Sequence, residues 1–492
     1  MRKKVVIVGA GVGGLASAIR LTVSGFEVEI FENSAFAGGK IAEFRKNGYR
    51  FDTGASVITL PGLVQELFVM AGEDPEQYIL FHKLEISCKY FYNDGTIIDA
   101  FTDTNKFIQE IKEKTNAEPY HLQSFLKESS ELFDLTAKPF LFSPFQKLST
   151  LLSQDGRKLI RNLNKLDIFR SLHHSNRKTL SDPKLIQLFD RYATYNGSNP
   201  FQAPATLKTV AHLEHNTGLY LPEKGMYELI RSLVKLTEKL NIKINYNTTV
   251  DEIVVKNKMV KGIRCGEKYT EADVVISNAD IYLTYKKLLK NINLPATLRY
   301  QALSSSAILF YWGIKTKIPK FDIHNVLFSG DYREEFRHIF KYGTIYNDPT
   351  IYIYISSKLN PADAPDNREN WLVMINTPNN TGQDWNALRD TTRKSVIRKI
   401  NKILDMDIEK YIETEDYEDP VRIEHFTDSY RGALYGPSSN KKLSAFYRHA
   451  NFSRKIKGLY FASGSVHPGG GIPICFASAQ IVSNLIIEDY CN

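Results

Sequence analysis

Two glycine-rich segments near opposite ends of the chain have the composition to hold an anionic cofactor. The first reads Gly-Ala-Gly-Val-Gly-Gly from Gly9 to Gly14, and the second reads His-Pro-Gly-Gly-Gly-Ile-Pro from His467 to Pro473. Glycine lets the backbone come close to a ligand, and a helix that begins there directs unpaired N–H groups at negative charge. Each segment is therefore a candidate binding loop, whose chemistry depends on the elements beside it.

The first loop lies within a strand, turn, helix, strand unit. Residues 4–8 form an apolar, β-branched run typical of a buried parallel strand, and residues 27–31 form a second. Between them, residues 15–23 favour a helix that Gly25 is placed to end. In this context the GxGxxG spacing predicts a dinucleotide-binding domain.

The glycines of this loop have separate expected roles. Gly9 permits the tight turn, Gly11 lets the backbone approach a pyrophosphate, and Gly14 lets the helix pack closely on the strand, with Gly13 in the same loop. Glu32 follows the second strand and is placed to accept hydrogen bonds from ribose hydroxyls. These features alone do not separate NAD from FAD.

The segment after Glu32 narrows the choice of cofactor. It contains a paired glycine, Gly38 and Gly39, followed by Lys40 and then by Gly-Tyr-Arg-Phe-Asp-Thr-Gly at residues 48–54. This arrangement resembles flavoproteins of the amine-oxidase and carotenoid-desaturase type. The resemblance implies FAD as the cofactor, glycines that keep side chains clear of its phosphates, and a positive charge from Lys40.

The second glycine-rich loop is also placed between a strand, at residues 458–462, and a helix, at residues 474–487. A helix N-terminus at this point can stabilise negative charge on a reduced flavin. The loop is similar to the C-terminal signature of the phytoene desaturase family of bacterial carotenoid dehydrogenases. That resemblance covers essentially the whole chain and implies cofactor contacts at Gly464, Ser465, Gly471 and Ile472, and at the backbone of Val250 beside the adenine.

The lead-in to this signature bears on the substrate. Many phytoene desaturases have Gly-Ala-Gly-Thr before the His-Pro pair, whereas this chain has Ser-Gly-Ser-Val from Ser463 to Val466. This Ser-Gly-Ser-Val sequence is more similar to that of the enzymes that desaturate the 3,4 position of 1-hydroxylated acyclic or monocyclic carotenoids of the γ-carotene type. Phytoene desaturation, carotene cis-trans isomerisation and a non-catalytic flavoprotein stay open, and an amine oxidase fits less well because its usual closing motif differs.

The expected reaction depends on the flavin, because a polyene offers no carbonyl or amine to polarise. We expect hydride transfer from an allylic carbon to flavin N5 and loss of a proton to a base or water. His467 is a candidate for the proton step, and a backbone role in the flavin loop also explains its place in the motif. The four cysteines show no metal-ligand spacing, and no metal is expected. Oxygen and quinone are the electron acceptors considered.

The 492 residues exceed what one hydrophobic core supports, so several domains are expected. The fold class is α/β with an α+β substrate part. A Rossmann-like FAD-binding domain is expected from residues 1–85, 205–295 and 455–492, a mixed-sheet substrate domain from residues 86–111 and 296–454, and a helical lid or membrane-facing subdomain from residues 112–204. An Asn-Asp-Gly turn at residues 93–95 predicts a hairpin. Candidates to line a substrate cavity, or to serve plain packing, are Tyr311, Trp312, Tyr352 and Tyr354.

Charge and hydropathy suggest where the protein acts. The net charge is +8, and no nucleic-acid module accompanies it. No uncharged apolar stretch is long enough to predict a membrane span. Residues 138–170 mix basic and apolar side chains, which is typical of a surface that rests on anionic lipid, although a solvated helix face has a similar composition. We expect a cytoplasmic protein bound peripherally to the cytoplasmic membrane.

Overall fold

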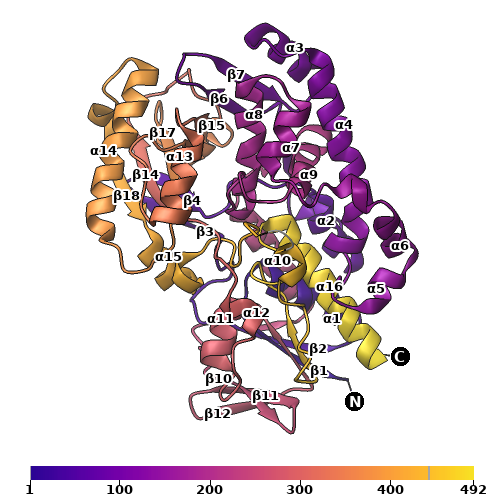
Figure 1. The fold of residues 1–492 in the computed structure, drawn as a ribbon. Coiled ribbons are helices and arrows are strands. Elements are labelled where there is room, and N and C mark those ends of the chain that lie inside the picture. Colours follow the sequence, from indigo (N-terminus) through magenta and orange to yellow (C-terminus); the bar gives the residue numbers. More distant parts are fainter. Residues whose placement is uncertain (1, 442–443, 492) are drawn as a thin grey trace.

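Two large sheets organise the chain, one wholly parallel and one mixed (Figure 1). The structure is a computed structural model that describes residues 2–441 and 444–491. Helices separate and cover the sheets, so the α/β class expected from the sequence is confirmed. The domain boundaries given above stay a prediction.

The parallel sheet carries the first glycine-rich loop. Its strands, in spatial order, are β19 (Leu459–Phe461), β13 (Val274–Ser277), β1 (Lys4–Val8), β2 (Glu27–Phe31) and β9 (Lys243–Asn245). Val5, Val6 and Ile7 in the central strand have no exposed surface, as expected for a parallel strand covered on both faces. Segments from the beginning, the middle and the end of the chain therefore meet in one sheet.

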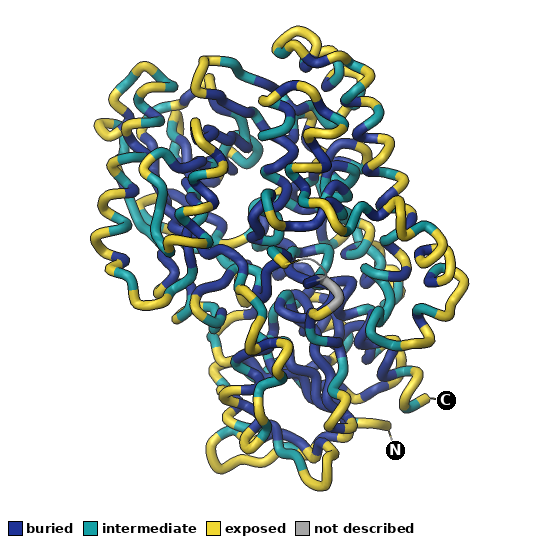
Figure 2. The backbone as a smooth tube through the Cα atoms, viewed as in Figure 1, coloured by how far each residue is buried: buried dark blue, intermediate teal, exposed yellow. Residues whose placement is uncertain are grey.

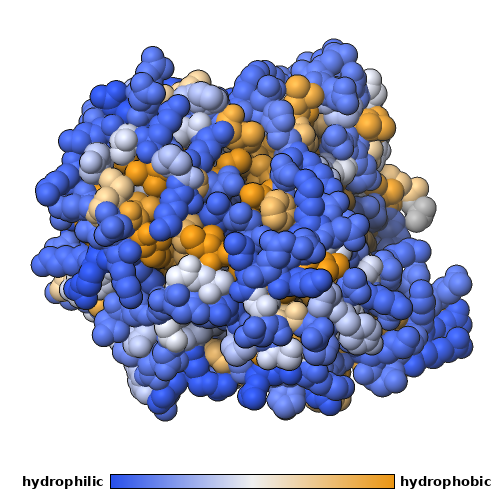
Figure 3. All heavy atoms as spheres, turned by 90° about the horizontal axis from the view of Figure 1, so that it is seen from above, coloured by the Kyte–Doolittle hydropathy of each residue, from blue (hydrophilic) through white to orange (hydrophobic). Residues whose placement is uncertain are grey.

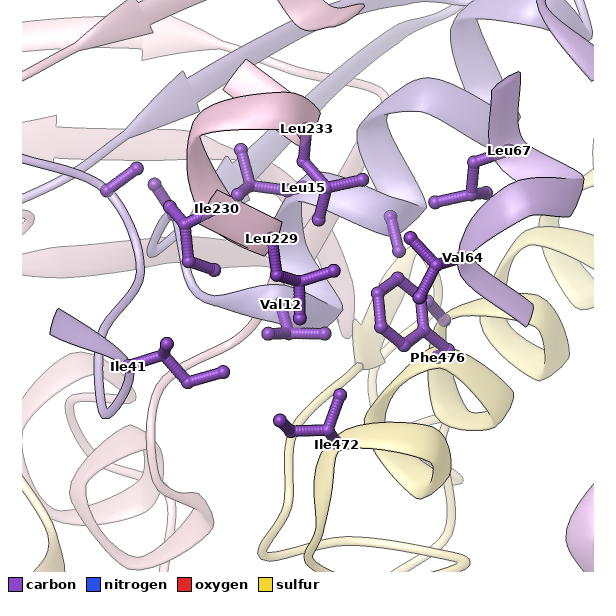
Figure 4. Packing of buried hydrophobic residues seen from close by; sticks show 14 of the residues in the cluster. Val12, Leu15, Ile41, Val64, Leu67, Leu229, Ile230, Leu233, Ile472 and Phe476 are labelled. Carbon is purple, nitrogen blue, oxygen red and sulfur yellow. The ribbon is translucent and has the colours of Figure 1, made fainter. Parts of the chain in front are cut away.

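Helices from equally distant parts of the chain pack on this sheet. They are α1 (Val12–Val23), α2 (Gly62–Met70), α10 (Glu228–Lys239) and α16 (Ile472–Cys491). Figure 4 shows their side chains meeting in one buried cluster, with Leu15 from α1, Val64 from α2, Leu233 from α10 and Phe476 from α16. This cluster fixes the helix that follows each glycine-rich loop.

The last helix departs from the expectation that no segment has the composition of a membrane span. In the described part of the chain, α16 alone among the helices is long and apolar enough to cross a membrane, by length and composition only. Glu488 and Asp489 interrupt its apolar run, so no uncharged stretch of that length marks it in the sequence. Of its apolar window, 56% is buried inside the protein, and its packing against α1 accounts for that composition.

Smaller strand groups lie around the parallel sheet. A three-stranded antiparallel sheet contains β10 (Glu252–Lys256), β11 (Met259–Cys265) and β12 (Lys268–Glu271). Two pairs complete this part of the fold: β3 (Ala42–Lys46) with β4 (Tyr49–Thr53), and β5 (Phe81–Lys83) with β8 (Tyr220–Pro222).

The mixed sheet has seven strands. Their order is β18 (Ile412–Glu418), β14 (Ser306–Ile314), β17 (Glu369–Thr377), β16 (Ile351–Tyr354), β15 (His324–Leu327), β6 (Ile86–Phe91) and β7 (Ile97–Phe101). Only the β15–β6 pair is parallel. The hairpin predicted around residues 93–95 forms from β6 and β7, with the Gly95 N–H donating to the Tyr92 carbonyl.

Alternation along the strands gives this sheet two different faces. One face packs against α14 (Trp385–Leu404), where Trp312 and Val373 are buried together with Val396. Tyr311 and Tyr354 lie on the other face, in the cluster that also contains residues of the parallel-sheet region. Trp312 therefore serves packing against α14, which removes it from the candidates to line a substrate cavity on the opposite face.

Most of the region expected to be helical does form helices, on the right of Figure 1. They are α4 (Pro119–Thr136), α5 (Leu148–Leu152), α6 (Gln154–Arg161), α7 (Leu172–Thr179) and α8 (Pro183–Asp190), and α3 (Thr104–Lys114) precedes them, mostly outside the expected region 112–204. Shorter helices elsewhere are α9 (Thr209–Ala211), α11 (Ile281–Leu283), α12 (Ala296–Arg299), α13 (Tyr332–Arg337) and α15 (Pro420–Thr427). Figure 2 shows burial concentrated in the interior strands and exposure along the outer helices.

Candidate functional site

The first glycine-rich loop is held from both sides by the parallel sheet. The Gly9 N–H donates to the Phe31 carbonyl at 2.8 Å, and the Gly11 N–H donates to Oδ1 of Asn278 at 3.0 Å. A methyl group on Gly13 would collide with the Ala462 carbonyl oxygen, and one on Gly14 would collide with the Gly9 carbonyl. Close packing of loop, helix and strands therefore requires glycine at these positions.

Glu32 lies at the end of β2, where the sequence places it, and its carboxylate also anchors the loop. Oε2 accepts the Ala10 N–H at 2.7 Å, Oε1 accepts the Ser34 N–H at 2.9 Å, and the residue is buried. Each carboxylate oxygen has a second lone pair, which can accept a ribose hydroxyl. The Thr248 N–H donates to the Glu32 carbonyl, which brings the segment leading to Val250 to the same edge of the sheet.

Val250 is buried just before β10. Its backbone N–H makes none of the protein hydrogen bonds found in the described part of the chain. A buried N–H without a protein partner requires another acceptor. A ring nitrogen at the edge of an adenine can serve as this acceptor, as the resemblance implies for this position.

The Gly38, Gly39 and Lys40 segment lies directly against the first loop. Gly11 and Gly38 form a β-bridge, and a methyl group on Gly39 would lie 3.7 Å from the Gly11 Cα with no other atom near it. Gly39 therefore faces open space, whereas the glycines of the first loop face protein.

Lys40 is enclosed by protein and still has accessible side-chain surface, so it faces an internal space. Its ammonium group donates to the Leu434 carbonyl at 2.6 Å. Burial lowers the pKa of Lys40, and the nearby carboxylate of Asp280 and the thiol of Cys475 act in the opposite direction. The same space is therefore bordered by the Gly38–Lys40 segment and by the start of α16.

The second glycine-rich loop closes this space at the start of α16. Gly471 has a φ of 115°, and no atom lies within 4 Å of the position that its Cβ would take. Gly464 lies against Gly470 and Cys475, and Ile472 is buried as the first residue of the helix. The resemblance implies that the flavin ring binds beside the N-terminus of this helix, and the open space at Gly471 has this position.

The serines before the signature have a structural task. The Ser465 hydroxyl accepts the Ile281 N–H at 2.8 Å and lies 2.9 Å from the Ser463 hydroxyl. These bonds join the loop after β19 to the segment after β13. A cofactor contact at Ser465 must therefore come mainly from its backbone.

His467 belongs to the loop, but its imidazole points away from the open space. Nε2 lies 3.1 Å from the Ser143 carbonyl, the ring meets the Phe140 ring edge-on at 5.0 Å, and the residue has no exposed surface. Burial lowers the pKa of His467 to about 4. A neutral imidazole bound to the helical region is suited to positioning the loop, and this geometry favours the backbone role over the proton step.

Two residues important for the site were not singled out from the sequence. Asn278 bridges the first loop and β19, because its Nδ2 donates to the Ala462 carbonyl while Oδ1 binds Gly11. Arg50 is buried in an ion cluster with Asp52, Glu43 and Asp363. Arg50 lies in the segment at residues 48–54, so the signal for it was present without an assigned role.

These features together test whether FAD fits. Gly39 and Gly471 border open space, Glu32 retains lone pairs for ribose hydroxyls, and Lys40 supplies a cation beside that space. The predicted contact residues from both ends of the chain are thus brought to one site, with only the His467 ring directed elsewhere. In the described part of the chain, no group of His, Cys, Asp and Glu side chains could hold a metal ion.

Comparison with known families decides the class. A profile described as flavin containing amine oxidoreductase matches residues 12–487, which include both glycine-rich loops. The chain belongs to the flavin-containing amine oxidoreductase family. It is therefore an FAD-dependent oxidoreductase.

Several relatives of the chain have names that describe reactions of carotenoids. The chain is 42% identical over 98% of its length to 1-hydroxycarotenoid 3,4-desaturase of Flavobacterium sp. (strain P99-3), covering 99% of that protein. It is 30% identical over 99% of its length to 4,4'-diapolycopene oxygenase of Methylomonas sp., covering 98% of that protein, and 27% identical over 99% to phytoene desaturase of Fusarium fujikuroi, covering 90%. The resemblance predicted from the motifs is confirmed.

Solved structures share the fold. Cyclohexylamine oxidase of Brevibacterium oxydans IH-35A superposes with a TM-score of 0.64 at 12% identity, and each chain is covered completely. An oxidoreductase from Methanosarcina mazei gives 0.64 at 16% identity, covering 99% of this chain and 100% of that one. At these identities the likeness shows the fold alone.

Proposed function

We propose that the protein is a carotenoid desaturase that introduces the 3,4 double bond into a 1-hydroxylated acyclic or monocyclic carotenoid. The observation that carries the proposal is the 42% identity, over nearly the full length of both chains, to 1-hydroxycarotenoid 3,4-desaturase. The Ser463 to Val466 lead-in to the second loop supports the same branch.

The chemistry divides between cofactor and chain. Bound FAD supplies the hydride acceptor, and the substrate also loses a proton as the new double bond joins the polyene. The chain supplies an apolar surface that orients the allylic carbons. Leu309, Val326, Leu372 and Met374 lie on the face of the mixed sheet opposite α14, and none of these side chains carries a charge. With His467 turned away, water is the proposed proton acceptor.

A surface cavity of about 730 Å³ lies at the helical region and is the proposed entry for the substrate. Its lining combines Phe169, Phe201 and Phe340 with polar and basic side chains such as Arg170, Gln202 and Lys441. Seen from above, hydrophobic atoms gather in the middle of the molecule between hydrophilic margins (Figure 3). A long polyene can enter along such a surface without exposing its chain to water.

The helical region also supports docking on the cytoplasmic membrane. Large apolar side chains stand exposed there, with Leu148 at 69%, Leu152 at 63% and Phe169 at 70%. The exposed basic residues around them are Lys138, Arg157, Lys158, Arg161, Lys165 and Arg170. We call these nine residues the basic-apolar patch. Apolar side chains inside a basic rim fit an anionic bilayer, from which the substrate is taken. The proposed electron acceptor is oxygen or a quinone.

The decisive experiment supplies the protein with substrates in parallel. Cells that express the chain receive either phytoene or a 1-hydroxylated carotenoid, and chromatography with mass detection follows the products. Loss of two hydrogen atoms from the hydroxylated substrate supports the proposal. Loss from phytoene alone would assign the protein to phytoene desaturation, and gain of oxygen would assign it to the chemistry named for the Methylomonas relative.

A further inference from the structure

A buried histidine on the cofactor-facing side of the mixed sheet has an unused nitrogen. His324 in β15 is 2% exposed, and its Nδ1 lies 2.8 Å from the hydroxyl oxygen of Tyr352. Its Nε2 is buried and has no hydrogen-bond partner among the residues that the structure describes. The rings of Tyr352 and Tyr354 lie nearly parallel to the imidazole at 6.0 and 5.1 Å, so its orientation is fixed.

A hydrogen-bonded path connects this histidine to the cofactor-binding segment. The Tyr352 hydroxyl lies 2.6 Å from the hydroxyl of Ser56. Ser56 follows Gly54 by two residues, and Gly54 packs so closely on the Lys40 carbonyl that a methyl group there would collide with it. The path of Ser56, Tyr352 and His324 therefore joins the mixed sheet to the segment that packs on Lys40.

The protonation state of His324 indicates which kind of group can form a hydrogen bond with Nε2. Burial, together with the positive charge of Arg191, lowers the pKa of His324 to about 3, so the imidazole is neutral. A neutral imidazole carries one N–H, and with Nδ1 paired to Tyr352, Nε2 is left as an unpaired donor or an unpaired acceptor. A hydroxyl can satisfy either form because it both donates and accepts. A hydrocarbon satisfies neither, and a buried polar group without a partner is unfavourable.

We propose that Nε2 of His324, oriented by Tyr352 and Ser56, binds the hydroxyl group of the substrate and selects hydroxylated over unhydroxylated polyenes. The inference rests on the proposed function and adds the residue that recognises the substrate. A hydroxyl at carbon 1 is separated from carbon 3 by a single carbon, so its partner must lie close to the reacting bond. The path from His324 through Tyr352 to Ser56 leads from the imidazole toward the Gly38–Lys40 segment, and the proposal places the substrate hydroxyl at its His324 end.

The test compares two substrates that share one polyene and differ only in the hydroxyl at carbon 1. The wild-type protein, loaded with FAD, is assayed on both in vesicles to obtain kcat and KM for each. We expect His324→Phe to lower kcat/KM for the hydroxylated substrate roughly tenfold or more, and to leave the unhydroxylated one unchanged or improved. Because the hydroxyl does not react, most of the change is expected in KM.

Two further variants separate recognition from folding. Tyr352→Phe keeps the ring and removes the hydroxyl that orients His324, so selectivity is expected to fall by about threefold to tenfold. Tyr417→Phe removes a hydroxyl from the strand beside β14, next to Phe310 on the α14 face, and is expected to leave selectivity unchanged. FAD content and the melting temperature of each variant establish that the protein is folded.

The outcomes distinguish this inference from the proposed function. A fall in selectivity confined to the hydroxylated substrate supports the role of His324. Equal losses on both substrates, or an unchanged ratio in His324→Phe, overturn it while desaturation by the wild type leaves the proposed function standing. If the wild type desaturates neither substrate, both the proposed function and the role of His324 fail.

Discussion

Oδ1 of Asn278 accepts the N–H of Gly11 at 3.0 Å and so ties the end of β13 to the first glycine-rich loop. The Nδ2 of the same side chain donates to the Ala462 carbonyl at the end of β19. One amide thus joins three segments of the cofactor site. Because both of its polar atoms are used, neither a carboxylate nor an aliphatic side chain can replace it fully.

Asn278→Ala is expected to weaken FAD binding roughly tenfold, since Gly11 loses its acceptor and the loop its link to β19. Asn278→Asp is expected to weaken it further, because a negative charge would lie beside the cofactor phosphates. Fluorescence titration of the apoprotein with FAD measures both. Asn245→Ala, in the edge strand β9 of the same sheet, is the control and should bind FAD normally. Normal binding by both Asn278 variants would contradict this role.

Gly13 and Gly39 are expected to respond differently to alanine. At Gly13 a methyl group collides with the Ala462 carbonyl, so the variant should lose about 1 to 3 kcal/mol of unfolding free energy. At Gly39 the methyl group meets only the Gly11 Cα at 3.7 Å, and the left-handed φ of 59° costs about 1 to 2 kcal/mol. Gly39→Ala should therefore fold and still lose FAD, because its methyl group enters the open space. Full FAD content in folded Gly39→Ala would show that the cofactor lies elsewhere.

The ion cluster around Arg50 is expected to stabilise the segment that leads to Gly54. Arg50 is 2% exposed and faces Asp52, Glu43 and Asp363, so Arg50→Ala leaves the buried carboxylates of Asp52 and Asp363 without their cation, while Glu43 keeps Arg231. Urea denaturation should show a loss of about 3 to 5 kcal/mol. Arg368→Ala breaks the more exposed pair with Glu413 and should cost no more than about 1 kcal/mol. Similar losses in the two variants would argue against a special role for the buried cluster.

The stability of the protein should depend on pH through His467. Its pKa falls from 6.5 to about 4 on folding, so between these values the unfolded chain binds more protons than the folded one. The stabilisation is complete above about pH 6.5 and is lost as the pH falls toward 4. From pH 7 to pH 5 the contribution of this residue amounts to about 2 kcal/mol. Denaturant unfolding of His467→Phe should show a pH dependence that is smaller by this amount.

His324 and His449 have pKa values lowered to about 3 and about 4 by burial. They therefore also make the unfolding free energy of the wild type fall as the pH is lowered. The comparison between the wild type and His467→Phe isolates the single residue. An unchanged slope would mean that His467 is not buried as a neutral imidazole.

Membrane binding is expected to depend on the basic-apolar patch. Leu152→Glu and Phe169→Glu should each reduce co-sedimentation with vesicles containing anionic lipid by roughly tenfold, because each removes an apolar side chain from the interface. Added salt should weaken binding of the wild type. Phe426→Glu is the matched control, since Phe426 is 62% exposed on α15, away from the patch. Equal effects of the three substitutions would place the contact elsewhere.

Individual strands, helices and turns could be predicted from the sequence, whereas the tertiary contacts between distant segments could not. The β1, α1 and β2 unit and the β6–β7 hairpin follow from short-range patterns, in which periodicity and turn residues act within a few positions. The contact between Gly11 and Asn278 spans 267 positions. No pattern in one sequence encodes such a pairing, because it depends on how distant strands order themselves in the sheet.

In the candidate site, too, some residues could be predicted from the sequence and others could not. Glu32 and the glycines were predicted because their spacing has a physical meaning in a single unit. The direction of the His467 ring depends on Phe140 and Ser143, more than three hundred positions away, and only the folded chain reveals it. Trp312 and Tyr311 are neighbours in one strand, and the helix that covers one face decides which of them is available to a ligand.

The order of strands in the parallel sheet has a consequence for biosynthesis. β19 begins at Leu459, and it pairs with β13, which in turn pairs with β1 near the start of the chain. The emerging polypeptide cannot complete its nucleotide-binding sheet until β19, hundreds of residues after β1, has left the ribosome. Such distant pairings slow folding and leave apolar strands exposed in the meantime. Production of the active enzyme should therefore be sensitive to chaperone supply and to any truncation that removes β19.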